Sequence, residues 1–415
     1  MKIKDMGRVV TGKTPLTGVN EYYGGNIMFI SPSDLHGDYL IEKSEKTITE
    51  EGLKSIESNS IDGISVLTGC IGWDMGNVAM CNSRCATNQQ INAIIDFNHK
   101  LVDPRYVYYW LKGKKDYLFS IASVTRTPIL SKSVFENIDI PLPSLKIQER
   151  VTKLLSLIDE KIRKNHQIND YLEEMAKTIY DYWFVQFDFP DENDKPYKSS
   201  GGKMVNANGH IIPEGWTFCK VKDIISNICT GLNPRDNFKL GTGAIKYITV
   251  KNLTTNGTLD FTGCDTIDEF ARAIVHNRSN IQIGDILFAS IAPLGRCYLI
   301  QSEPTDWDIN ESVFSIRANT ALVTPAFLYL YFMSDAFIKH ATSSSTGSIF
   351  KGIRINTLLE TELCVPPLSV ILKFEDCLAS TFPLKSKNYE EIQRLSNLRD
   401  WLLPMLMNGQ ATIED

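Results

Sequence analysis

The chain has 415 residues, of which 43% are hydrophobic and 22% are charged, a composition that suits two or three folded domains and excludes a disordered protein. Its formal net charge of −6 argues mildly against nucleic-acid binding, because a binder of this composition must gather its Lys and Arg locally or share the nucleic acid with basic partners. No run approaches the roughly 18 apolar residues of a membrane span and residues 1–10 lack the apolar core of a signal peptide, so we expect a cytoplasmic protein with no membrane partner.

From the N-terminus, short apolar strands alternate with polar loops and predict an α/β unit. A Thr-Gly motif at 11–15 is followed by a strand at 28–30, a polar turn at 31–35 and an apolar strand at 63–67. The triplet Asn88-Gln89-Gln90 precedes a further strand, and an aromatic helix is predicted over 104–111. The unit ends in a Pro-Leu exit at 140–145.

The next stretch predicts one long helix. Residues 145–186 contain neither Pro nor Gly, and a seven-residue pattern fits them, which is typical of a coiled-coil seam; about 40 helical residues would span about 60 Å. One column holds Val151, Ile158, Asn165, Leu172 and Ile179, and the other holds Leu155, Ile162, Asn169, Ala176 and Trp183. A third column of Leu154, Ile168, Met175 and Tyr182 predicts that the helix faces more than one partner element.

Two asparagines interrupt this seam at mid-length. If Asn165 and Asn169 are buried, they lower stability but fix the register and the partner. If the register slips locally, they face solvent instead. The sequence leaves both interpretations open.

The first unit then repeats at an offset of about 220 residues, after a segment at 188–212 with the composition of a linker. Seven landmarks recur in the same order. They include Thr230-Gly231 with Pro234, a strand at 247–249, a turn at 250–253, an apolar strand at 284–288, Asn310-Glu311-Ser312, an aromatic helix at 325–332 and an exit at 364–368. A duplicated domain is best explained by two similar ligands or by two halves of one ligand.

A second helical tract follows the repeat, from Leu368 to about Asn408. Ile392, Leu395 and Leu402 belong to its apolar stripe. Pro383 is expected to break this tract into two pieces, because proline removes a hydrogen-bond donor and clashes with the preceding turn, and a second disruption is expected near Pro404.

Motifs typical of catalysis occur in this chain only in part or in the wrong context. Gly7–Thr14 matches the phosphate-binding pattern GxxxxGK[ST], but only six residues precede it and Pro15 opposes a helix after it. The segment around Pro190 and Asp191 has the wrong spacing for a nuclease core, and the glycine-rich cofactor loop and Pro-Pro-aromatic segment expected of a DNA methyltransferase are missing. The nine cysteines contain no CxxC pair, so no metal site is predicted. We therefore expect no catalytic residues and no cofactor in this chain.

The loops contain residue types that bind DNA, because phosphates prefer Lys, Arg, Ser, Thr and backbone N–H groups, and base edges prefer Arg, Lys, Asn and Gln. The candidates of the first copy are Lys13, Thr14, Ser33, Arg84, Asn88, Gln89, Thr125 and Arg126. The candidates of the second copy are Asn233, Arg235, Lys251, Asn252, Arg296, Asn310, Ser345 and Lys351.

The chain resembles the specificity subunit of type I restriction-modification systems over nearly its whole length. The resemblance rests on the segments 11–15, 140–150, 158–162, 172–176, 183–187, 212–216 and 398–409. It implies two target-recognition domains that each read one half of a split sequence in double-stranded DNA, and two long antiparallel helices that set the spacer. It also implies that these helices dock two methyltransferase subunits, and that restriction subunits join the full complex. S-adenosylmethionine, ATP and Mg are then expected on the partner subunits.

Two features depart from the family pattern. The N-terminus has no Trp-containing lead before the first Thr-Gly motif, whereas the second copy has one at Pro213–Trp216, and Pro383 interrupts the distal helix.

These observations predict an α+β protein with two similar α/β recognition domains separated by two long antiparallel helices that form a coiled-coil spacer. The predicted segments are a first recognition domain at 1–143, a long helix at 144–187, a linker at 188–212, a second recognition domain at 213–366 and a helical region at 367–415. The helix-packing residues are predicted to be Val151, Leu155, Ile158, Ile162, Leu172, Met175, Ile179, Trp183, Ile392, Leu395 and Leu402. The alternatives are a stand-alone nucleotide-binding enzyme that uses Gly7–Thr14, and a coiled-coil scaffold that does not bind DNA.

Overall fold

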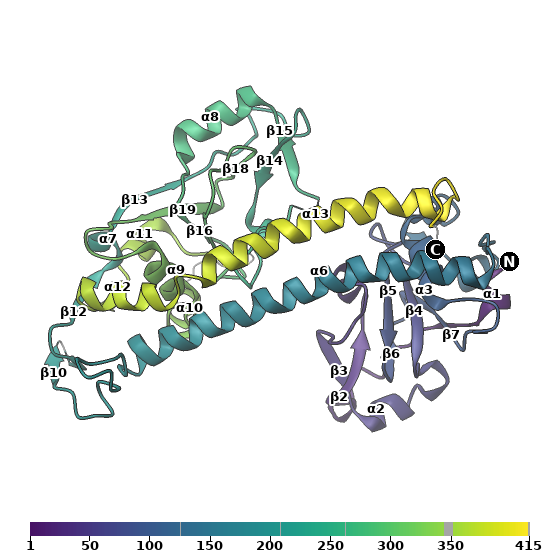
Figure 1. Ribbon diagram of the computed structural model, residues 1–415, viewed down its shortest axis with the longest axis horizontal. Coiled ribbons are helices and arrows are strands. Elements are labelled where there is room, and N and C mark those ends of the chain that lie inside the picture. The colour runs from purple at the N-terminus through teal and green to yellow at the C-terminus, as the bar shows by residue number, and fades with distance from the viewer. Residues whose placement is uncertain (125, 208, 262, 344–351, 414–415) are drawn as a thin grey trace. The chain divides into compact units, whose positions relative to one another are not determined.

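The computed structural model describes residues 1–124, 126–207, 209–261, 263–343 and 352–413 (Figure 1). These residues form two compact units, each of which is described by itself. Unit 1 holds residues 1–165 and 390–415, and unit 2 holds residues 166–389. Within the described residues, no helix is both long and apolar enough to cross a membrane.

Unit 1 contains the first repeat (residues 1–143), which is built on two small sheets. The four-stranded sheet has the order β1-β7-β4-β5 with antiparallel neighbours, and in the three-stranded sheet β2 pairs antiparallel with β3 and parallel with β6. The strands are β1 (Arg8–Thr11), β2 (Tyr23–Ile30), β3 (Lys46–Ile48), β4 (Ile64–Gly69), β5 (Val78–Asn82), β6 (Cys85–Thr87), β7 (Ile91–Ile95), β8 (Ser123–Val124) and β9 (Pro128–Ile129). The helices are α1 (Ile3–Met6), η1 (Asn20–Tyr22), η2 (Pro32–His36), α2 (Glu50–Lys54), η3 (Glu57–Asn59), α3 (Pro104–Lys112), α4 (Lys115–Ser120) and α5 (Lys132–Glu136).

Unit 2 contains the second repeat (residues 213–366), which has the same two sheets. The orders β13-β19-β16-β17 and β15-β14-β18 reproduce the pairing of the first repeat, including its one parallel pair. The strands are β11 (His210–Pro213), β12 (Thr217–Lys220), β13 (Ile225–Thr230), β14 (Ile245–Ile248), β15 (Asp265–Ile267), β16 (Ile286–Ala289), β17 (Cys297–Leu299), β18 (Trp307–Ile309), β19 (Val313–Ala318) and β20 (Glu362–Val365). The helices are α7 (Val221–Ile224), η5 (Val250–Asn252), α8 (Glu269–Ser279), α9 (Pro325–Met333), α10 (Asp335–Ser343) and α11 (Ile355–Leu359). The predicted α+β class with two similar domains is confirmed.

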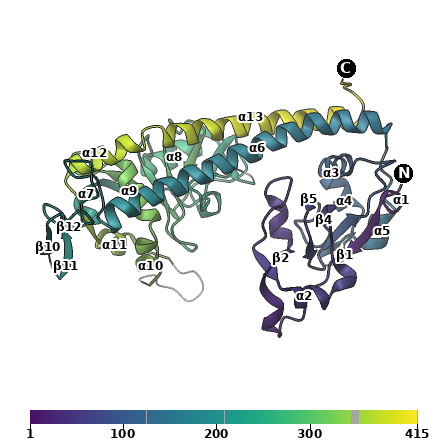
Figure 2. The same ribbon diagram turned by 60° about the horizontal axis from the view of Figure 1, so that its bottom comes forward.

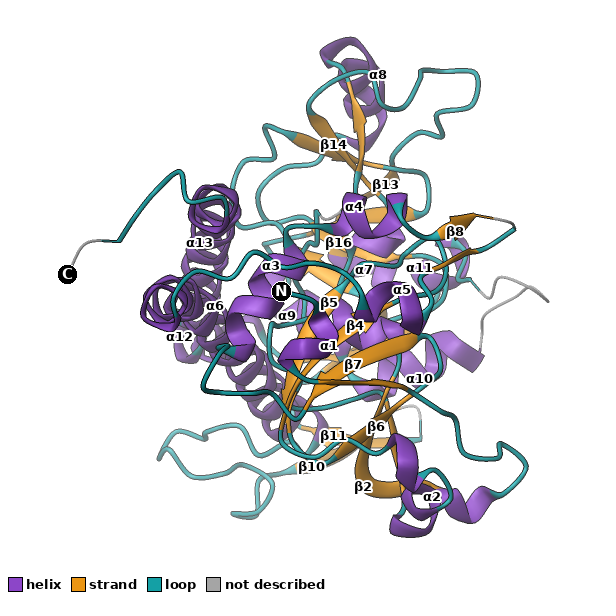
Figure 3. Cartoon of the chain, turned by 90° about the vertical axis from the view of Figure 1, so that its right-hand side faces the viewer, coloured by secondary structure: helices purple, strands orange, loops and turns teal. Residues whose placement is uncertain are grey.

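Each four-stranded sheet is buried on both faces, which explains the continuous apolar runs of its strands. In the first repeat, alternate residues such as Val66 and Ile94 face α3, while Leu67 and Ala93 face the three-stranded sheet. Figure 3 shows α3 between strand β5 and the long helix α6 (Leu145–Tyr180). The second repeat places α9 in the equivalent position beside α6, as Figure 2 shows.

Helix α6 continues into one turn of π-helix, η4 (Asp181–Val185), and the distal tract forms α12 (Leu368–Cys377) and α13 (Thr381–Met407). Within each unit, α6 and α13 are antiparallel. In unit 1 Asp159 binds Arg399 and Asn165 binds Glu391. The residue number therefore increases along α6 as it decreases along the facing part of α13.

The structure corrects the predicted effect of the two prolines. The distal tract is in two pieces, but the break lies before Pro383, which occupies the first turn of α13. That turn has no intrahelical partner for a backbone N–H, so proline is tolerated there. Pro404 lies inside α13, which continues to Met407.

The segment predicted as a linker also contains regular structure. Strand β10 (Met204–Ala207) pairs with β11 in an antiparallel hairpin. The Phe189 and Tyr197 rings stack at 4.7 Å, and Phe189 also packs 5.3 Å from Trp216. Aromatic packing therefore orders a stretch whose composition is polar.

Both asparagines of the α6 seam are buried, so the first interpretation holds. Asn165 donates to Glu391 at 2.9 Å in unit 1. Asn169 accepts a hydrogen bond from Asn388 at 3.0 Å in unit 2. Each is satisfied by a residue of α13, which favours one register of the two helices.

Candidate nucleic-acid interface

Several polar loops of the first repeat converge where strands end. Strands β1, β2, β4 and β6 end at the edge of the sheets where β7 begins. Hydrogen bonds join the loops, since Gly12 N–H donates to Ile91 O at 3.0 Å and Asn88 N–H donates to Ile30 O at 3.1 Å. We name residues 12–15, 31–35, 70–77 and 88–90 the strand-end loops of the first repeat. Those of the second are residues 231–237, 249–253, 290–296 and 310–312.

The Thr-Gly motif exists in both repeats because its glycine lies against another loop. A Cβ on Gly12 would lie 2.1 Å from the carbonyl oxygen of Asn88, and a Cβ on Gly231 would lie 1.7 Å from that of Ile309. Real Cβ atoms do not approach backbone that closely, so any larger residue would separate the loops.

The asparagine of each triplet shapes its own turn. Asn88 accepts from Gln90 N–H and Asn310 accepts from Ser312 N–H, each at 3.0 Å. Their amide groups donate to the side chains of the same residues, at 3.0 and 3.2 Å. These two predicted DNA contacts therefore also position the loop.

A second turn is also shared. Asp34 accepts from Ser31 N–H at 2.7 Å, and Asn252 accepts from Thr249 N–H at 2.8 Å. Asn252 is buried and donates its amide to Asp260 O at 2.8 Å. Its side chain holds this turn in place.

Two predicted pairs occupy equivalent positions. Thr14 donates to Gln89 Oε1 at 2.7 Å in the first repeat, and Asn233 donates to Glu311 Oε1 at 2.7 Å in the second. Each pair ties the Thr-Gly loop to the triplet loop.

The remaining candidates differ in location. Lys13, Ser33, Arg235 and Lys251 are exposed on the strand-end loops, and Arg296 is half-buried there. Arg126 is exposed in the β8–β9 hairpin, whereas Arg84 lies at the opposite end of β5 and forms an ion pair with Glu50 at 2.7 Å. Thr125, Ser345 and Lys351 lie outside the described residues.

The predicted helix-packing residues also separate into classes. Those with buried side chains are Val151, Leu155, Ile158, Ile162, Trp183 and Ile392. Leu172, Ile179, Leu395 and Leu402 are half-buried, and Met175 is 42% exposed.

A further column of α6, which the apolar pattern did not predict, consists of Thr152, Asp159, Glu173 and Tyr180, and we name it the polar column. All four are buried. Thr152 donates to Asp103 at 2.7 Å, and the Tyr180 ring lies 5.8 Å from Phe327. The column thus faces the repeat in each unit, and its polar members made it invisible to a hydrophobic pattern.

The two acids of the polar column have the same kinds of partner. Asp159 accepts from Tyr109 at 2.7 Å and pairs with Arg399 at 2.8 Å. Glu173 accepts from Tyr329 at 3.0 Å and pairs with Lys385. Burial, and after it the nearby carboxylate, raises the pKa of both tyrosines. Each hydroxyl therefore stays protonated and donates a hydrogen bond to the carboxylate.

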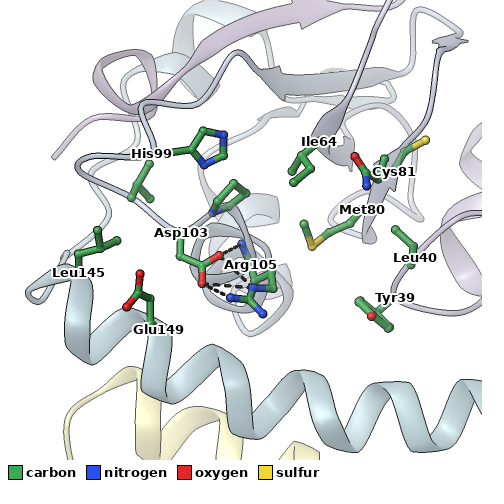
Figure 4. Close-up of a pocket in the computed structure, with 13 residues that line it drawn as sticks. Tyr39, Leu40, Ile64, Met80, Cys81, His99, Asp103, Arg105, Leu145 and Glu149 are labelled. Atoms are coloured by element: carbon green, nitrogen blue, oxygen red, sulfur yellow. Dashed lines mark hydrogen bonds and ion pairs between the residues drawn. The ribbon is translucent and has the colours of Figure 1, made fainter.

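A pocket of about 480 Å³ lies in unit 1 between the first repeat and the start of α6 (Figure 4). Its charged pair is Asp103 with Arg105, whose Nη2 donates at 2.8 Å. Asp103 also caps α3 by accepting from Arg105 N–H at 3.0 Å, and it accepts from Thr152. This carboxylate therefore positions α3 and α6. Among the described residues, no three His, Cys, Asp or Glu side chains are placed to hold a metal ion.

A family model described as the type I restriction modification DNA specificity domain matches residues 1–174 and residues 213–394. The chain belongs to this family. The two matched stretches contain the two repeats, each with part of the helices. The strand-end loops are therefore parts of DNA specificity domains.

Individual relatives agree with the family model. The chain is 26% identical to the specificity subunit of type I restriction enzyme MjaIX from Methanocaldococcus jannaschii, with 100% of this chain and 93% of that protein covered. It is 30% identical to the HindI specificity subunit of Haemophilus influenzae over 178 residues, which are 43% of this chain and 39% of that protein. The fold is similar to that of a type I S subunit from M. genitalium, with a TM-score of 0.52 at 14% identity and coverage of 98% and 95% of the two chains.

Replacing the Thr-Gly glycine tests the close approach of the loops. Gly12→Ala should lower the free energy of unfolding by about 1–3 kcal/mol, because the new methyl group overlaps backbone. Gly18→Ala is the control, since its Cβ would meet nothing within 4 Å and should change stability by less than about 1 kcal/mol. Urea unfolding of both variants measures the difference. Equal midpoints would contradict the steric explanation.

Removing one buried acid tests the polar column. Glu173→Gln leaves the Lys385 ammonium buried without a counter-charge and should destabilise the chain by about 3–5 kcal/mol. The adjacent Glu174 is exposed, so Glu174→Gln should stay within about 0.5 kcal/mol of the parent. Thermal and urea unfolding provide the measurement, and a stable Glu173→Gln chain would show that the ion pair does not tie these elements together.

Proposed function

We propose that the chain is the sequence-reading component of a type I restriction-modification complex, in which each repeat reads one half of a bipartite DNA target. The observation that carries the proposal is the duplication. Both repeats have the same two sheets, the same strand order and the same strand-end loops. Two equivalent readers in one chain suit a target with two parts.

The proposed DNA contacts are the exposed side chains of these loops. Lys13 and Arg126 in the first repeat and Arg235 and Lys251 in the second supply positive charge for phosphates or donors for base edges. Because the whole chain has a net charge of −6, we propose that partner subunits share the DNA with it.

The proposed docking site for methyltransferase subunits is an apolar column that runs along α6 into η4. Ile168 and Met175 are each 42% exposed and Tyr182 is 38% exposed, at a spacing of seven residues. Side chains at this spacing lie on one side of the helix, and a row of exposed apolar groups is typical of a protein interface. These three are members of the third column predicted to meet another partner element.

In this proposal the chain does not itself cut or methylate DNA. The Gly7–Thr14 pattern gives it no phosphate-binding loop, because residues 8–11 form strand β1 and no helix follows Gly12 directly. We propose that S-adenosylmethionine is bound by two methyltransferase subunits, and that ATP and Mg are used by restriction subunits in the full complex.

Methylation mapping tests the proposed function. Co-expression of the chain with its methyltransferase subunit should produce methyladenine at one split motif, and neither protein alone should do so. Sequencing that detects modified bases across the host genome gives the motif directly. Methylation without sequence preference, or at a single uninterrupted motif, would contradict the proposal. As a control, replacing residues 213–366 with the second domain of a relative should change only one half of the motif.

A separate prediction concerns docking. The triple variant Ile168→Gln, Met175→Gln, Tyr182→Gln should reduce methyltransferase affinity about a hundredfold, because it removes three apolar groups from the interface. The double variant Glu174→Gln, Thr178→Gln alters exposed polar positions of the same helix and should bind normally. Co-purification and titration measure the affinity. Normal capture by the triple variant would place the docking site elsewhere.

A further inference from the structure

The indole of Trp73 is exposed on a strand-end loop of the first repeat. It is 72% exposed and Trp401 on α13 is 58% exposed, whereas the other four tryptophans, Trp110, Trp183, Trp216 and Trp307, are buried. Tryptophan is mostly buried in folded proteins, and an indole left in water forgoes the free energy of burial. An exposed indole on a defined loop therefore suggests a ligand with a flat apolar face.

Hydrogen bonds hold the loop on both sides of Trp73. Gly72 N–H donates to Pro128 O at 3.0 Å, and Gly76 N–H donates to Gly69 O at 2.8 Å. Met75 is buried, and Asp74 accepts from Asn77 at 3.0 Å. The indole is thus presented by a fixed backbone, so binding does not have to order the loop.

Side-chain contacts also fix the direction of the loop. Lys115 donates to Asn77 at 2.9 Å and lies 3.5 Å from Asp74, which also pairs with His36. The Trp73 ring lies 5.8 Å from the Phe119 ring, which supports one side of the indole.

The position of Trp73 connects it to the proposed DNA contacts. Its loop begins beside the triplet turn, where Cys70 N–H donates to Gln90 O at 2.7 Å. The β8–β9 hairpin, which presents Arg126, pairs with the same loop through Ile71 and Ile129. Cationic Lys115 and Arg126 therefore lie on the segments that adjoin the indole.

We propose that Trp73 contacts DNA in the first repeat, stacking its indole on a base or inserting it at a base step. This inference rests on the proposed function. Aromatic side chains beside cations bind bases through their ring faces, and apolar side chains can wedge between base pairs. A docked protein is less favoured, because the segments that adjoin Trp73 are polar and cationic, with Asp74, Asn77 and Lys115 at hydrogen-bond or ion-pair distance from one another.

The second repeat has no aromatic residue in the equivalent loop, where Ala292, Pro293 and Leu294 precede Gly295. Trp73 therefore affects only the half of the target that the first repeat reads.

The experiment uses the complete complex of chain and methyltransferase with a duplex that holds the mapped motif, titrated by fluorescence anisotropy. Trp73→Ala should weaken binding about 5- to 100-fold, the range found when a stacking side chain is removed. Trp73→Phe keeps a ring face and should stay within about threefold of the parent. The control is Leu101→Ala, an exposed apolar residue beyond the opposite end of β7 that should leave the affinity unchanged.

Two further measurements separate the possible outcomes. Substituting bases in one half of the motif at a time should show that Trp73→Ala relaxes discrimination in one half only. Methyltransferase co-purification should be unchanged. Parental affinity of Trp73→Ala, or loss of the methyltransferase from that variant, would overturn the proposal for Trp73. A parent complex that binds motif and unrelated duplexes equally would instead overturn the proposed function.

Discussion

The interaction on which the architecture depends is the pairing of a buried acid of α6 with a cation of α13 and a tyrosine of a repeat. A carboxylate buried without partners costs several kcal/mol, and Asp159 and Glu173 each avoid this cost by meeting both groups at once. A shift of either helix along its axis, or rotation of the repeat on α6, would leave the acid unpaired. Both acids and both cations recur after 14 residues, which is two heptads, so the same helix faces meet in each unit.

The same constraint of satisfied polar groups governs the loops. Asn88, Asn252 and Asn310 have the side-chain chemistry of base readers, yet hydrogen bonds within the chain occupy them. At Gly12 and Gly231 the backbones of two neighbouring loops are in close contact, so each loop restricts the position of the other. These internal contacts fix the loop conformation, so the loop conformation does not depend on the exposed side chains. We therefore assign DNA recognition to the exposed side chains of the loops, and loop positioning to the buried, hydrogen-bonded ones.

The features that were predicted correctly are those that produce a regular spacing of apolar residues in the sequence. The repeat, the strands and the aromatic helices follow from residues such as Val66 and Phe327 that a pattern detects. The polar column was missed because Asp159 and Glu173 look like surface residues in a helix that is charged elsewhere. The effect of Pro383 was wrong because the pattern does not show that α13 begins at Thr381. The β10–β11 hairpin was read as linker because its order comes from strand pairing and from packing of Val205 and Ile212 on the core of unit 2, which the polar composition does not show. Side-chain type alone could not separate Lys13, which is exposed, from Asn252, which is buried.

The faces of α6 explain why a chain of this kind would act with partners. Residues of the two seam columns meet α13 or α12, and the polar column faces a repeat. In contrast, Ile168, Met175 and Tyr182 keep 38–42% of their surface exposed. Exposed apolar side chains at seven-residue spacing are a poor solution for an isolated protein, and their burial would contribute free energy to assembly. The net charge of −6 leads to the same inference from electrostatics, because non-specific attraction to DNA requires an excess of positive charge, which the chain as a whole lacks. In the proposed complex, partners would supply that attraction and the chemistry, and the two repeats would supply the discrimination between sequences.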